Sequence, residues 1–79
     1  MLKLKRVPFV HPDPRVRAAT SAHFHYYYEG APIASVAHVL PPLAFSPQWE
    51  LYWFDTGDIE IVASLEEAEK KIAAKVETV

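Results

Sequence analysis

The sequence predicts a small α+β domain, in which a mostly antiparallel sheet of three to four strands carries one C-terminal helix on one face. Residues 49–54 are rich in aromatic side chains, and a turn separates them from the alternating residues 59–63, as in a β-hairpin. Residues 22–28 and 33–40 flank a second turn, Glu29-Gly30. Residues 65–79 place apolar side chains at intervals of three and four, which is typical of a helix. One sheet and one helix suit a chain this short.

The 79 residues have room for one domain, 1–79, in which residues 41–48 form a proline-rich internal linker. The chain contains no cysteine, which excludes disulfides and thiolate zinc sites. No apolar run approaches the ~20 residues that span a bilayer, and the basic N-terminus lacks the apolar core of a signal peptide. We therefore expect a cytoplasmic protein with no membrane partner.

Residues 1–15 combine an alternating segment with three prolines, and they either join the fold or form an extended arm. The alternation in Leu2–Val7 predicts a short edge strand, whose lysines discourage pairing with other chains. The prolines that follow favour an extended connection. Asp13-Pro14 equally suits the start of a helix over residues 15–22. We favour extended chain from about Ala19 onward.

The first hairpin is predicted around a two-residue Glu29-Gly30 loop. This loop pairs Tyr28 with Ala31 and Tyr26 with Ile33, and it gives a mostly apolar face that would join the core. A short helix after Pro32 is the alternative for residues 33–40, and their β-branched residues favour the strand. The opposite face of this hairpin would then carry His23, His25, Tyr27, Ala34, Val36, His38 and Leu40.

The second hairpin is predicted around a three-residue loop with Gly57 in the left-handed conformation. A two-residue loop would set Asp55 directly opposite Asp58, and like charges in that position are destabilising. The core face then contains the pairs Trp53–Ile59, Leu51–Ile61 and Trp49–Ala63. The other face contains Glu50, Tyr52, Phe54, Asp58, Glu60 and Val62.

The C-terminal helix begins with a capping box, in which the Ser64 hydroxyl accepts from the Glu67 amide and the Glu67 side chain reaches back. Its apolar stripe contains Leu65, Ala68, Ile72, Val76 and Val79. We expect this stripe to pack on the sheet. The predicted core residues are Trp49, Trp53, Ile61, Leu65 and Ile72.

The surplus of aromatic side chains is the feature that bears most on function, because one helix cannot cover them all. Exposed aromatic surface usually marks an interaction site. We therefore predict a non-catalytic protein-binding module without a cofactor, which associates as a homo-oligomer. The alternative is that the N-terminal residues or the linker with Phe45 cover this face. The predicted interface residues are His23, His25, Tyr27, Tyr52 and Phe54.

Enzymatic function is not predicted. The serines have no sequence context that suggests activation, and two glycines are too few for a phosphate-binding loop. His23, His25 and His38 would converge on one face in the predicted register and could supply three zinc ligands. We expect no metal, because exposed or interfacial histidines among aromatics need none.

Two charge patterns indicate alternative partners. The acidic residues of the C-terminal half could dock onto a nucleic-acid-binding protein, as an accessory or inhibitor protein from a mobile element does. Five basic residues and one acid in residues 1–20 instead indicate a nucleic-acid-binding arm. The acidic surface comprises Asp55, Asp58, Glu60, Glu66, Glu67 and Glu69, and the basic arm comprises Lys3, Lys5, Arg6, Arg15 and Arg17.

Overall fold

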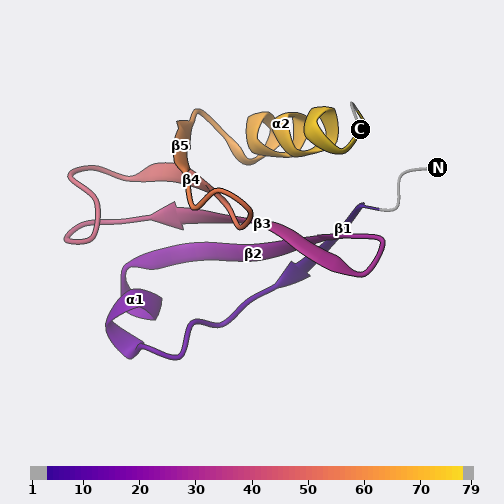
Figure 1. The fold of residues 1–79 in the computed structure, drawn as a ribbon. Coiled ribbons are helices and arrows are strands. Elements are labelled where there is room, and N and C mark those ends of the chain that lie inside the picture. Colours follow the sequence, from indigo (N-terminus) through magenta and orange to yellow (C-terminus); the bar gives the residue numbers. More distant parts are fainter. Residues whose placement is uncertain (1–3, 78–79) are drawn as a thin grey trace.

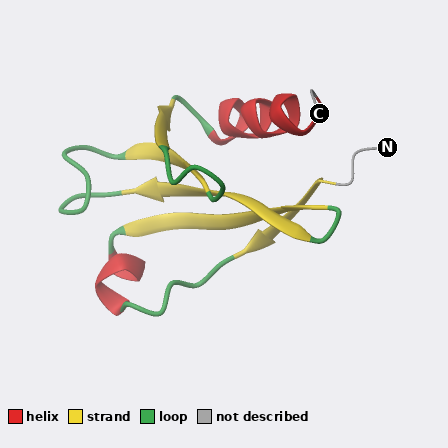
Figure 2. Cartoon of the chain, in the orientation of Figure 1, coloured by secondary structure: helices red, strands yellow, loops and turns green. Residues whose placement is uncertain are grey.

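The computed structural model describes residues 4–77, which form one five-stranded antiparallel sheet with strand order β1-β2-β3-β4-β5. The elements are β1 (Leu4–Pro8), α1 (Pro14–Ala18), β2 (Thr20–Tyr28), β3 (Ala31–Val39), β4 (Gln48–Trp53), β5 (Ile59–Val62) and α2 (Leu65–Glu77). Figure 1 shows α2 on one side of the sheet and α1 on the other. The sheet therefore separates the two helices (Figure 2). The predicted α+β class is confirmed, with one strand more than expected.

The N-terminal segment forms both an edge strand and a helical turn. β1 pairs with β2 at the edge of the sheet, as the alternating pattern predicts, while Leu2 and Lys3 lie outside the described residues. Asp13 caps α1, because its side chain accepts a 2.9 Å hydrogen bond from the Arg15 amide, and Pro14 occupies the first turn. The helical alternative is thus correct for residues 15–18 and wrong for residues 19–22, because the chain is extended from Thr20.

The β2–β3 hairpin has the predicted two-residue loop but a different register beyond its first pairs. Glu29 and Gly30 have φ values of 51° and 84°, which a type I′ turn requires, and Tyr28 pairs with Ala31. A β-bulge at Ile33 then shifts the pairing, so that Tyr26 faces Ala34. The predicted pairing of Tyr26 with Ile33 is therefore wrong, and so is the helical alternative for this segment.

The β4–β5 hairpin is displaced by one residue from the predicted register. The Trp53 amide donates to the Asp58 carbonyl at 2.9 Å, which leaves a four-residue loop ending in Gly57 at the predicted left-handed φ of 78°. Trp49 pairs with Val62 and Leu51 with Glu60. Val62 is consequently buried, and the prediction that Ile59, Ile61 and Ala63 lie on the core face is wrong.

Two contacts explain why this register is the stable one. The indole of Trp53 donates a 2.6 Å hydrogen bond to the Glu60 carboxylate, which requires both side chains on the same face of the hairpin. Lys71 of α2 lies 3.4 Å from the same carboxylate. The Trp53 indole thus holds Glu60 on the α2 side of the sheet. Its neighbours Ile59 and Ile61 therefore lie on the opposite face.

Helix α2 has the predicted cap and apolar stripe. The Glu67 amide donates to the Ser64 hydroxyl at 3.2 Å, and the Glu67 carboxylate accepts from the Ala63 amide. Ala68 and Ile72 are fully buried, while Leu65 and Val76 are half-buried; Val79 lies outside the described residues.

The core lies between α2 and the sheet. Trp53 and Ile72 are buried as predicted and Trp49 and Leu65 pack against the core, whereas Ile61 is 59% exposed and the prediction that it is a core residue is wrong. The Tyr26 hydroxyl donates to Glu69 at 2.8 Å, and burial together with this carboxylate raises the pKa of Tyr26. The buried cluster comprises Tyr26, Ala34, Val36, Leu51, Trp53, Val62, Ala68 and Ile72.

Candidate interaction surface

The sheet face opposite α2, called here the open face, carries side chains from all five strands at two matched levels. The antiparallel registers place the residues of each level side by side across the sheet, with Phe9 continuing β1 through a 3.0 Å hydrogen bond from its amide to the His23 carbonyl. Level one contains Phe9, His23, Ala37, Glu50 and Ile61. Level two contains Val7, His25, Ser35, Tyr52 and Ile59.

Apolar side chains on the open face remain exposed to solvent. Ile59 and Ile61 are each 59% exposed and Tyr52 is 38% exposed, although all three lie on regular strands. Burying such side chains against another surface is favourable at roughly 25 cal/mol per Å². The open face therefore exposes apolar side chains whose burial would be favourable.

Rings cover the part of the open face near β1 and β2. Phe9 stacks on His25 with 3.8 Å between ring centroids, and its edge meets His23 at 4.9 Å. Phe54 reaches the same cluster, with its ring 5.4 Å from His25 and 5.5 Å from Tyr52. This half of the face is thus preorganised by ring contacts.

The structure resolves which segments cover the open face. Phe9 and His11 lie over β2, so the N-terminal part joins the fold and covers one side. Phe45 of the linker is fully exposed and contributes no cover. The covering is therefore partial, and the β4–β5 half of the face stays open.

The imidazoles of the cluster are held in a setting that disfavours their charged form. Burial lowers the pKa of His23, and the charges of His25 and His11 lower it further. Burial also lowers the pKa of His25. Since His23 Nε2 lies 3.0 Å from the hydroxyl of the buried Ser35, this pair ties β2 to β3 through a neutral contact.

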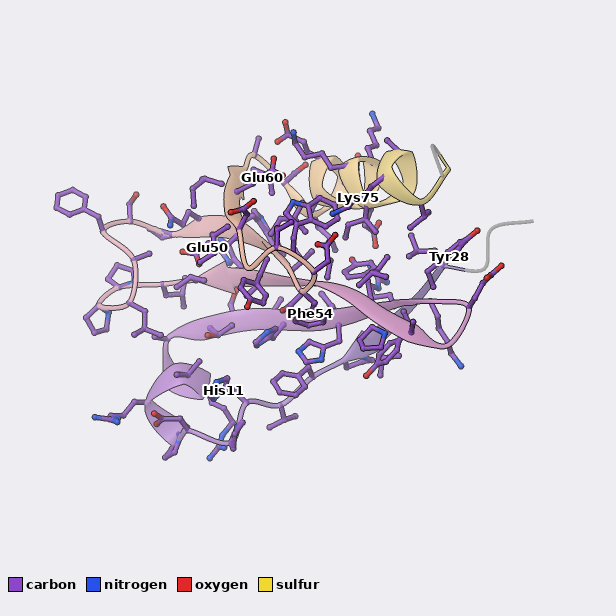
Figure 3. The ribbon with its side chains drawn as sticks, viewed as in Figure 1. His11, Tyr28, Glu50, Phe54, Glu60 and Lys75 are labelled. Carbon is purple, nitrogen blue, oxygen red and sulfur yellow. The ribbon has the colours of Figure 1, made fainter. Side chains whose placement is uncertain are left out.

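A groove of about 420 Å³ runs over the centre of the open face. The small residues Ser35 and Ala37 form its floor, because they lie between larger neighbours on β2 and β4. Val16 of α1 and Leu43 of the linker line it, together with Glu50, Tyr52 and Phe54. Figure 3 shows His11 on the α1 side of the sheet, whereas Glu60 and Lys75 lie toward α2.

The predicted interface residues share one face. His23, His25 and Tyr27 project from β2 and Tyr52 from β4, and the Phe54 ring joins them through the ring contacts described above. The sequence reasoning missed Ile59 and Ile61, because it used a register displaced by one residue. It also missed Phe9, for which the signal was the alternation of Val7 and Phe9 across Pro8.

His38 does not join His23 and His25. The bulge at Ile33 places His38 on the α2 side, where its ring lies 4.7 Å from that of Trp49 and its Nδ1 contacts the Ser21 hydroxyl. The predicted convergence of three histidines is therefore wrong. Within residues 4–77, no set of three or more histidine, aspartate or glutamate side chains is grouped to hold a metal ion.

The acidic residues are dispersed around α2, and several have contacts within the fold. Asp55 accepts from Lys75 at 2.9 Å, a hydrogen bond that lowers the pKa of Asp55. The hydrogen bond from the Trp53 indole likewise lowers the pKa of Glu60. Glu67 caps α2, Glu69 accepts from Arg6 at 3.1 Å, and Glu66 and Asp58 are exposed.

The basic residues are also spread over separate elements. Arg6 lies over the Phe24 ring and pairs with Glu69 on the α2 side. Arg15 pairs with Asp13, and Arg17 donates to the His11 carbonyl at 2.7 Å. Lys5 is exposed on the open side of β1, and Lys3 lies outside the described residues.

No family model matches the sequence, and neither a curated protein nor a solved structure shows significant similarity to it. Of the helices within residues 4–77, none has the length and apolar character that crossing a membrane requires. The functional interpretation therefore depends on the geometry of the open face.

Proposed function

We propose that this chain is a non-catalytic protein-binding module and that the open face is its binding surface. The observation that carries this proposal is the exposure of Ile59, Ile61 and Tyr52 on a regular, five-stranded sheet face. Fully buried interface centres are rich in such aliphatic and aromatic side chains and poor in charge. Glu50 and Lys5 are the acidic and basic residues that the strand registers place on this face, among the residues described.

The surroundings of Ser35 do not suit nucleophilic catalysis. Ser35 has His23 beside it, but the hydroxyl belongs to a buried residue within a paired strand. Acyl transfer also needs backbone donors directed at a developing oxyanion. The amides that flank Ser35 belong to a β3 strand paired on both sides, so their hydrogen bonds go to neighbouring strands.

The proposal is tested by using the full chain as bait in an extract of its host cell. Proteins retained by the wild type are compared with those retained by Ile61→Lys and by Phe45→Lys. The Phe45 variant is the matched control, because it removes an exposed apolar side chain from the linker. We expect Ile61→Lys to lose the retained proteins and Phe45→Lys to keep them. Equal retention by all three baits would contradict the proposal.

A further inference from the structure

The two levels of the open face are complementary to themselves under a twofold rotation. We propose that the partner of this face is a second copy of the chain, packed face to face so that two sheets form a sandwich with both α2 helices outside. This inference rests on the proposed function, whose binding surface it assigns to one partner. Twofold dimers are the commonest closed assemblies of soluble proteins.

The axis that produces this match runs parallel to the strands, midway between the two sheets and over β3. Rotation about it places β1 over β5 of the second copy, β2 over β4, and β3 over β3. At level one, Phe9 then faces Ile61 of the second copy and Ala37 faces its own equivalent. At level two, Val7 faces Ile59 of the second copy. The exposed isoleucines are thereby covered by the apolar side chains of β1.

The same twofold rotation places charged and polar side chains of the two copies opposite one another. His23 faces Glu50 of the second copy, and His25 faces Tyr52 of the second copy. These pairs lie one strand from the axis. A rotation of about 30° between the sheets therefore displaces them by only about 2 Å, half the displacement at the outer strands. Because the assembly is symmetric, the His23–Glu50 pair occurs twice.

The shape of the face also fits a second copy. Ser35 and Ala37 form the floor of the groove on the axis, which leaves room for Tyr52 and His23 of the opposing sheet to lean in. Helix α1 stands at the end of β2 and borders the face, as Figure 1 shows. The sheet edges then take no part in association, which agrees with the lysine and proline in β1 and the short length of β5.

The size of the face sets the expected strength of association. Five strands at about 4.8 Å and the two levels at about 6.7 Å give roughly 320 Å² per copy, or roughly 640 Å² in total. This is smaller than most specific interfaces, so we expect a weak and reversible dimer. Light scattering on a sizing column should give a mass rising from 9.0 kDa toward twice that value as concentration increases.

Two charge variants test the arrangement by complementation between chains. His23→Glu alone would set a new carboxylate against Glu50 of the second copy. Glu50→Lys alone would remove the carboxylate that faces His23 and place an ammonium group in the interface with no carboxylate opposite it. Each variant is expected to be monomeric, whereas their mixture forms a dimer with one carboxylate–ammonium pair and one His23–Glu50 pair. Near-ultraviolet circular dichroism confirms that each variant is folded. Dimerisation of both single variants as strong as that of the wild type would overturn the proposal.

A cross-linking measurement keeps the proposal testable even where a charge variant fails to fold. The chain has no cysteine, so Ala37→Cys introduces a unique thiol next to the axis. A short bis-maleimide should couple it to a second copy, while the exposed Ala74→Cys on α2 stays uncoupled. Coupling through residue 74 alone would overturn the arrangement. A wild-type monomer at all concentrations would overturn the second copy as partner, whereas the bait comparison tests the binding face independently.

Discussion

The two faces of the same sheet use apolar side chains in opposite ways. On the α2 side, Ile72 is fully buried against Leu51, Val36 and their neighbours, and polar groups such as the Tyr26 hydroxyl have partners inside the fold. On the open face, Ile61 is 59% exposed although its strand is equally regular. One face therefore stabilises the fold, whereas the other leaves apolar side chains in contact with solvent.

The largest expected effect comes from two isoleucines on opposite sides of this comparison. Ile72→Ala should lower the free energy of unfolding by about 2–4 kcal/mol, because it leaves a cavity beneath α2. Ile61→Ala should change it by no more than about 0.5 kcal/mol, because the side chain is already largely hydrated. Urea titrations at concentrations where the chain is monomeric measure both. Equal losses for the two variants would contradict the assignment of the faces.

Two tyrosines give a smaller and more specific contrast. Tyr26→Phe removes the 2.8 Å hydrogen bond to Glu69 and should cost about 1 kcal/mol, since Glu69 keeps Arg6 and solvent as partners. Tyr52→Phe, on the open face, should leave the stability of the monomer nearly unchanged. Thermal unfolding of both variants and of the wild type measures the two losses of stability. A larger loss for Tyr52→Phe than for Tyr26→Phe would contradict the assignment of the faces.

The pH dependence of stability should also differ between the two faces, and we expect this to be the smallest of the effects. His23 and His25 have pKa values below the ordinary 6.5, so the unfolded chain takes up protons first as the pH falls below 6.5. Stability should therefore decline below pH 6.5, and the decline should stop once the folded histidines are also protonated. The charged or titratable groups around them are His11, Arg17, Lys5, Tyr27, Tyr52 and Glu50.

The carboxylates of the α2 side respond at lower pH. Asp55 and Glu60 have pKa values below their ordinary 3.8 and 4.5, so the stability they contribute is present above those values and is lost as the pH falls through the lowered pKa values. A His23→Gln, His25→Gln double variant should lose the decline near pH 6.5 and keep the one in stronger acid. Urea midpoints across this range, together with histidine titrations by NMR, measure both steps. A decline near pH 6.5 that persists in the double variant would contradict this assignment.

Local patterns in the sequence were sufficient to predict the elements and the turn residues. The alternation in β1, the Glu29-Gly30 turn, the left-handed Gly57 and the Ser64–Glu67 cap each depend on a few adjacent residues. The α+β class followed from these local patterns. His23, His25 and Tyr27 share one face as predicted, because period-two alternation within one strand is independent of its partner.

Strand register was less predictable, because it depends on single residues in the loops and bulges. One extra residue at Ile33 and one in the loop after Trp53 each exchange the two faces of the strand that follows. Val36 and Val62 are therefore core residues in the structure, contrary to the prediction. Ile61 lies outside the core, and His38 lies on the opposite face from His23 and His25. Pro32 was a signal for the bulge, since a proline within a strand cannot donate to a ladder. The indole bond to Glu60, which fixes the second register, joins side chains that no local pattern relates.

Hydroxyl-radical footprinting at increasing protein concentration tests the central claim most directly, because it reports the solvent exposure of individual side chains. In the dilute chain, Tyr52, Ile59 and Ile61 should react readily, and their labelling should fall as the concentration rises. Phe45 and Val10, exposed outside the two levels, should react equally at all concentrations. Weak labelling of the open face in the dilute chain, or protection of Phe45 in its place, would contradict the account.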